Sequence, residues 1–159
     1  IINNHSKSLL NLTPLLTHKS PSINRHRVFS ETLKKNGVKC IDYIWNTKQR
    51  TEEYHQQMNK LFDEYPEMDA MFSEDLIIMN ALKCAGERGM CIPDEFKAVG
   101  YDGTLIAKIS YPSMTYVSQP IKELADTLVD VLLKKINGAK LHEDIILKDV
   151  CLVKGQTTE

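Results

Sequence analysis

The chain has 159 residues, of which 42% are hydrophobic and 26% charged, a composition typical of one ordinary globular domain. Its 20 basic and 21 acidic residues give a net charge of −1. This balance argues against a DNA-binding surface in this stretch, because such surfaces cluster Lys and Arg. No apolar run reaches the roughly 20 residues that cross a bilayer, so we expect no membrane partner.

Strands and helices are predicted to alternate along the chain. The clearest helix carries an apolar side from Leu124 to Leu133 and ends at Asn137-Gly138. In chain order, the predicted elements are a strand at 8–12, a helix at 23–35, a strand at 40–44, a helix at 51–65, a strand at 70–72, a helix that ends at 88, a strand at 96–101, a short helix at 104–109, a strand at 114–117, a helix at 121–136 and two short strands near 144–147 and 150–154.

This alternation predicts an α/β fold in which a mainly parallel sheet is covered by helices on both faces, a three-layer sandwich. Right-handed crossovers make successive strands point the same way. Ligands of such folds bind in the crevice beyond the carboxyl ends of the strands. Residues that directly follow strands are therefore candidates for a binding site.

Four polar or aromatic residues follow predicted strands: Arg25, reached by the loop that begins at Thr13, and then Trp45, Glu74 and Asp102. A guanidinium, two carboxylates and an indole suit a polyhydroxyl ligand. The carboxylates accept hydrogen bonds from neighbouring hydroxyls, Arg offers a fork of donors, and an aromatic ring covers the C–H face of a sugar. We predict that these four residues bind a small-molecule effector.

Each of these residues also has a simpler structural explanation. Asp102 precedes Gly103 and fits a turn, and Arg25 fits a solvated surface charge. Trp45 fits the core or a subunit interface, and Glu74 fits the positive end of a helix dipole. Their shared placement after strands favours the binding site.

Catalytic and metal sites are not indicated by the sequence. The five histidines show no His-x-x-His spacing, and the glycines form neither a phosphate-binding loop nor a Gly-x-Ser-x-Gly motif. We therefore expect no enzyme activity, no metal and no cofactor. The four cysteines contain no Cys-x-x-Cys pair, which indicates buried, reduced thiols in a cytoplasmic protein; they are Cys40, Cys84, Cys91 and Cys151.

Three motifs occur in a specific order and spacing: the turn Ile92-Pro93-Asp94-Glu95, the strand end Val99-Gly100-Tyr101-Asp102, and the Thr-x-Val-x-Gln-Pro segment at 115–120. Together with the stretch 69–75, they resemble the effector domain of the lactose-repressor (LacI/GalR) family. The resemblance is strong from Asp69 onward and looser before Lys39. Upstream, Arg25 with Phe29 and Leu33 fits the family's Arg-x-x-Gly-Phe-x-x-Ala-Leu helix, although Val28 and Thr32 replace its small residues.

The resemblance implies a type I periplasmic-binding-protein-like fold with two subdomains joined by crossovers. Residues 8–118 and 149–159 would form the C-terminal effector subdomain, and residues 1–7 and 119–148 parts of the N-terminal one. The family's DNA-binding helix-turn-helix would be absent from this chain. By the same resemblance, Arg25 and Asp102 contact the effector, and Glu74 does so at a position where Asn is usual.

Trp45 falls near the family's aromatic ligand-stacking position. The family dimerises partly through the C-terminal subdomain, which would place Tyr111, Leu76 and Asn80 near the partner of a homodimer.

The implied function is that of a sugar-responsive effector domain of a transcriptional repressor, with a sugar or sugar phosphate as ligand. Allosteric coupling would transmit binding to operator DNA only through the absent N-terminal domain. The alternative is a periplasmic or extracellular sugar-binding protein or sensor domain, which shares the fold. The Ile-Pro-Asp-Glu turn and Gln119-Pro120 favour the repressor.

Overall fold

The computed structural model describes residues 7–14, 21–45, 51–139, 146 and 148–159. Its centre is a six-stranded sheet with the order β2-β1-β3-β4-β5-β6. The strands are β1 (Ser8–Pro14), β2 (Lys39–Trp45), β3 (Ala70–Phe72), β4 (Lys97–Asp102), β5 (Thr115–Ser118) and β6 (Cys151–Val153). The helices are α1 (Pro21–Lys35), α2 (Thr51–Glu64), α3 (Asp75–Glu87), α4 (Leu105–Ile109) and α5 (Ile121–Ile136).

The first five strands run parallel, as predicted, and β6 alone is antiparallel to its neighbour. Each of the first four strands is followed by a helix that returns the chain to the edge of the sheet where the next parallel strand begins. The strand predicted near 150–154 is β6. The strand predicted near 144–147 lies outside the described residues except for Ile146, which is in no strand.

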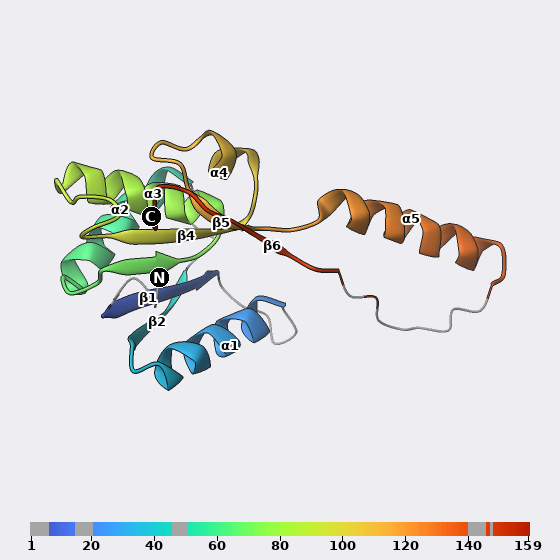
Figure 1. Cartoon of the computed structure of the whole chain (residues 1–159), viewed down its shortest axis with the longest axis horizontal. Coiled ribbons are helices and arrows are strands. Elements are labelled where there is room, and N and C mark those ends of the chain that lie inside the picture. Colours follow the sequence, from blue (N-terminus) through green and yellow to red (C-terminus); the bar gives the residue numbers. More distant parts are fainter. Residues whose placement is uncertain (1–6, 15–20, 46–50, 140–145, 147) are drawn as a thin grey trace.

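Helices cover both faces of the sheet, which confirms the predicted three-layer arrangement (Figure 1). On one face, α1 packs Leu33 and Phe29 against Leu9 and Phe72 of the sheet. On the other, α2 and α3 build the larger core, whose most buried members include Met58 and Ile78. The central strand β3 is buried along its whole length because both of its faces are covered.

The last residues of the chain are tied into the sheet by hydrogen bonds. The Thr157 hydroxyl donates to the carbonyl oxygen of Ala98 at 2.7 Å and accepts from the backbone N–H of Thr115 at 2.8 Å. A Cβ on Gly155 would lie 2.5 Å from the Ser113 carbonyl oxygen, so only glycine fits this approach. The tail therefore joins the starts of β4 and β5.

Helix α5 has no buried residue, and Figure 1 shows it standing apart from the sheet and its covering helices. Its bounds agree with the predicted helix. Its apolar side is exposed, however: Leu128 keeps 68% of its accessible surface. Among the described residues, no helix is long and apolar enough to span a membrane.

The four cysteines are free thiols, but the expectation that they are buried is wrong for Cys91 and Cys151, which are exposed. Cys84 is buried and Cys40 is partly so. Cys91 is exposed because it lies in the loop after α3, and Cys151 because β6 is the outer edge of the sheet.

Candidate functional site

The carboxyl ends of the parallel strands meet at one edge of the sheet. Phe72 pairs with Val99 and Asp102 pairs with Ser118, so β3, β4 and β5 end side by side there. Glu74 follows β3 by two residues, and Asp102 is the last residue of β4. The two carboxylates therefore lie at the same edge, on neighbouring strands, where the fold class places its ligands.

Asp75, the first residue of α3, lies buried beneath this edge. It is almost completely buried, and its Oδ2 accepts hydrogen bonds from the backbone N–H of Thr104 at 2.7 Å and from the Thr104 hydroxyl at 2.8 Å. A Cβ on Gly100 would lie 2.4 Å from Asp75 Oδ1, so the glycine leaves room for this carboxylate. Asp75 thereby anchors the loop that follows Asp102.

Asp102 lies in a strained backbone conformation, with φ of 111°, and is the only described non-glycine residue at positive φ. Gln119, just after β5, holds it from two sides. The Gln119 side-chain amide donates to Asp102 Oδ1, and the Gln119 backbone N–H donates to the Asp102 carbonyl oxygen at 3.4 Å. The carboxylate is thus fixed in position rather than free to rotate.

Arg25 reaches the same edge from the first turns of α1. Its guanidinium carbon lies 3.9 Å from the centre of the Tyr101 ring, close enough for a cation–π contact. Tyr101 in turn packs edge-on against Phe72, with ring centres 6.2 Å apart. Arg25 Nη2 also donates to the Ser22 hydroxyl at 3.3 Å. The contact with Tyr101, which itself packs on Phe72, holds the Arg25 guanidinium next to β4, the strand that carries Asp102.

The electrostatics of the edge oppose full ionisation of its carboxylates. Burial raises the pKa of Glu74, and nearby Asp102 and Asp75 raise it further, while Arg25 lowers it. Burial also raises the pKa of Asp102, against the lowering effects of the Gln119 hydrogen bond and of Arg25. One guanidinium therefore faces several acceptors, and the edge favours a ligand that donates hydrogen bonds.

Trp45 is the predicted site residue that the structure does not bring to this cluster. Its side chain is fully buried in the core and packs edge-on against Tyr54 of α2, with ring centres 5.2 Å apart. The end of β2 is on the correct edge of the sheet, but the ring turns inward beneath α2. In this position the simpler explanation, a core tryptophan, describes it.

The predicted interface residues lie on α3 and after α4. Tyr111 is 88% exposed, and Leu76 is partly exposed on the outer side of α3. Asn80 donates to the Leu76 carbonyl oxygen at 2.9 Å, one turn earlier in the helix. Asn80 is also partly exposed. The contact of these three residues with a partner subunit stays a prediction.

Four residues of the edge were missed by sequence reasoning: Asp75, Tyr101, Thr104 and Gln119. Asp75 and Tyr101 are next to predicted site residues in the sequence, Thr104 is two positions after Asp102, and Gln119 belongs to the Thr-x-Val-x-Gln-Pro segment. The signal for Asp75 was its acidic neighbour Glu74. The role of Thr104 rests on a contact across 29 residues that no local pattern reveals.

Comparison with known proteins agrees with this fold. Residues 11–158 match the family model described as periplasmic binding protein-like domain. The sucrose operon repressor of Streptococcus mutans is 42% identical over 90 residues, which cover 56% of this chain and 28% of that protein. The ribose operon repressor of Halalkalibacterium halodurans is 30% identical over 123 residues, covering 77% of this chain and 37% of that protein. The chain thus spans well under half the length of these relatives.

A solved LacI family transcriptional regulator from Arthrobacter sp. FB24, in complex with lactose, shares the fold with a TM-score of 0.83 at 18% identity. The match covers 99% of this chain and 60% of that one. The predicted resemblance to the lactose-repressor family is confirmed by these relatives. The chain belongs to the family of periplasmic binding protein-like domains, in the branch that contains the LacI-type regulators.

Proposed function

We propose that the chain is the effector-binding part of a LacI-type transcriptional repressor that responds to a sugar. The observation that carries this proposal is the meeting of Arg25, Glu74 and Asp102, from three separate segments, at one edge of the sheet. The relatives support a repressor over a periplasmic sugar-binding protein or sensor, since they are operon repressors. The similar regulator solved with lactose supports a sugar as ligand.

The ligand would be held mainly by acceptors. Glu74 and Asp102 would take hydrogen bonds from vicinal hydroxyls, and Arg25 would donate to a ring or hydroxyl oxygen. Asp75, through Thr104, and Gln119 would keep the Asp102 loop in place. In this role the three supporting residues position the site without touching the sugar.

The two-subdomain division remains part of this proposal. Residues 8–118 and 149–159 would form one subdomain, and 119–148 would belong to the other together with 1–7 and a segment outside this chain. The unburied apolar side of α5 supports this division, because such a surface normally packs against something. Effector binding between the subdomains would favour one relative orientation and so change DNA affinity.

The remaining parts of the proposal concern assembly and location. A homodimer would form partly through Leu76, Asn80 and Tyr111, whose outward placement supports it. Operator DNA would be bound by a domain outside this chain, because the chain itself carries a net charge of −1. The protein would act in the cytoplasm, without catalysis or a cofactor, as the regulator relatives suggest.

A thermal-shift screen of neutral sugars and sugar phosphates tests the proposal. A ligand at 100 times its Kd should stabilise the protein by about 2.7 kcal/mol. The Asp102→Ala variant should lose that response, whereas Asp94→Ala, in an exposed turn away from the edge, should keep it. A response that survives Asp102→Ala unchanged would show that the binding site lies elsewhere.

A further inference from the structure

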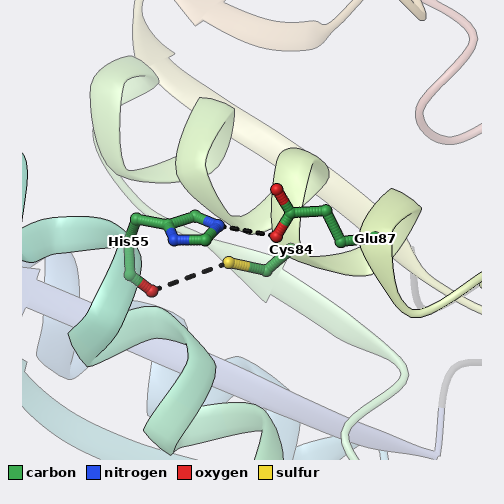
Figure 2. Close-up of side chains that lie close together, drawn as sticks. All are labelled: His55, Cys84 and Glu87. Carbon is green, nitrogen blue, oxygen red and sulfur yellow. Dashed lines mark hydrogen bonds and ion pairs between the residues drawn. The ribbon is translucent and has the colours of Figure 1, made fainter.

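A second cluster of ligand-type side chains lies between α2 and α3. His55 comes from α2, and Cys84 and Glu87 come from adjacent turns of α3 (Figure 2). His55 Nε2 lies 2.7 Å from Glu87 Oε2, and the Cys84 thiol points to the His55 carbonyl oxygen at 3.8 Å. The imidazole nitrogen, the thiol sulfur and a carboxylate oxygen all lie within 4.8 Å of one another.

This cluster is separate from the strand edge described above. Cys84 follows Asp75 by nine residues on α3, which is about 13 Å along the helix axis at 1.5 Å per residue. Glu74, Asp75 and Asp102 therefore play no part in the cluster. Its chemistry is also different, since it combines nitrogen, sulfur and oxygen donors in place of carboxylates and a guanidinium.

We propose that His55, Cys84 and Glu87 form a binding site for a zinc-type divalent ion that joins α2 to α3. Zinc binds imidazole, thiolate and carboxylate at 2.0–2.3 Å, which sets tetrahedral ligand atoms about 3.5 Å apart. The three ligand atoms lie within 4.8 Å of one another, so ion binding would bring them closer together by side-chain rotation, and two of the three side chains are partly exposed. A water molecule would complete the coordination.

The donor set selects the kind of ion. Mg²⁺ and Ca²⁺ prefer oxygen ligands throughout, whereas a mixed nitrogen, sulfur and oxygen set suits Zn²⁺ and Co²⁺. The thiolate and the carboxylate together balance the two charges of the ion. Burial and, to a smaller extent, Glu87 raise the pKa of the Cys84 thiol to about 11, so ion binding releases a proton from the sulfur.

Neighbouring residues already orient the cluster. Asn59, one turn after His55, lies 3.4 Å from His55 Nδ1 and leaves Nε2 facing Glu87. Arg88 bonds to the Asn59 side chain and pairs with Asp63 at 2.5 Å. Its positive charge also lowers the pKa of the Cys84 thiol, against the larger effect of burial. Lys83 lies 3.9 Å from the other oxygen of Glu87 and would be displaced only from a weak surface pair.

Titration of the chain with cobalt chloride tests the proposal, because a cobalt–thiolate bond gives a charge-transfer absorption in the near ultraviolet. We expect one equivalent of Co²⁺ to produce this band and zinc chloride to abolish it. Cys84→Ala should remove the band, and the exposed-thiol control Cys91→Ala should retain it. A parent chain without the band, or a band lost in Cys91→Ala instead, would overturn the site.

Two further variants keep the test valid if the buried Cys84→Ala protein folds poorly. His55→Gln and Glu87→Gln change partly exposed side chains, and each should weaken zinc binding about 100-fold or more, since even outer partners of metal ligands contribute 10–100-fold. His26→Gln, a histidine paired with Asp42 on the other face of the sheet, is the matched control and should bind like the parent. Equal affinities for His55→Gln and His26→Gln would contradict the proposal.

Discussion

Helices α3 and α5 have a similar pattern of apolar and charged residues, but α3 is packed in the core and α5 is exposed. Both are long, carry an acidic residue in the first turn and have one apolar side. Residues of α3 such as Ile78 and Ala81 are completely buried, whereas α5 has no buried residue at all. The comparison teaches that an amphipathic pattern predicts a helix and its apolar side, but not whether the surface that covers that side lies in the same chain.

The largest contrast between the two helices should appear on truncating an apolar residue. Ile78→Ala, in the core, should cost about 2–5 kcal/mol of unfolding free energy because it leaves a cavity. Leu128→Ala, on the exposed side of α5, should change it by less than about 0.5 kcal/mol. Urea unfolding of both variants measures the difference. A large loss for Leu128→Ala would mean that α5 is covered in solution.

A smaller contrast is expected at the acidic residue in each first turn. Asp75→Ala removes the acceptor of the Thr104 backbone N–H and hydroxyl, and should cost about 2 kcal/mol. Glu123→Ala removes only an exposed charge near the helix dipole of α5, and should cost no more than about 0.5 kcal/mol. Urea unfolding measures the loss of unfolding free energy in both variants. Equal losses for Asp75→Ala and Glu123→Ala would show that Asp75 acts only through the helix dipole.

Patterns of apolar residues, Pro and Gly within a short stretch of sequence predict the bounds of helices and strands. The bounds of α5 and β3 were predicted from apolar spacing and from Pro and Gly positions alone. The meeting of Glu74 and Asp102 at one edge followed from parallel strand direction. By contrast, the sequence could only place Glu74 near the positive end of a helix dipole, and the structure has it at the cap position of α3 with no side-chain cap bond.

The sequence misled where the direction of a side chain depends on tertiary packing. Trp45 lies at the end of β2, on the predicted edge, but its ring packs in the core beneath α2 against Tyr54. This direction depends on a contact with α2 that the local sequence does not reveal. The His55–Cys84–Glu87 cluster was not predicted because His55 lies 29 positions before Cys84 and 32 before Glu87, and meets them only when α2 packs on α3. Patterns at short spacing carry no information about such contacts.

The smallest expected effect concerns the pH dependence of Glu74, the cap residue of α3. Burial raises the pKa of Glu74 in the folded state above its ordinary value of 4.5. The protonated side chain therefore adds to the free energy of unfolding below pH 4.5, and this contribution is lost as the pH rises through the folded-state pKa. Glu74→Gln should therefore raise the melting temperature at pH 7. The increase should disappear as the pH falls below 4.5.

The matched control for Glu74→Gln is Glu123→Gln in the first turn of α5, an exposed position. It should give no stabilisation at pH 7, because no burial opposes its charge. Thermal melts of both variants from pH 4 to pH 7 provide the measurement. A melting temperature of Glu74→Gln that equals or falls below the parent at pH 7 would show that the carboxylate has a stabilising partner.

The tying of the last residues into the sheet has a mechanical consequence for α5. The chain leaves the sheet at Ser118 and re-enters beside it at Cys151, a paired position of β5 and β6, and the Thr157 bonds prevent the returning end from being pulled out. α5 is therefore joined to the sheet through two neighbouring strands, β5 before it and β6 after it. Gln119 lies between β5 and α5 and donates two hydrogen bonds to Asp102, so a displacement of α5 that moved Gln119 would also move the carboxylate proposed to hold the sugar.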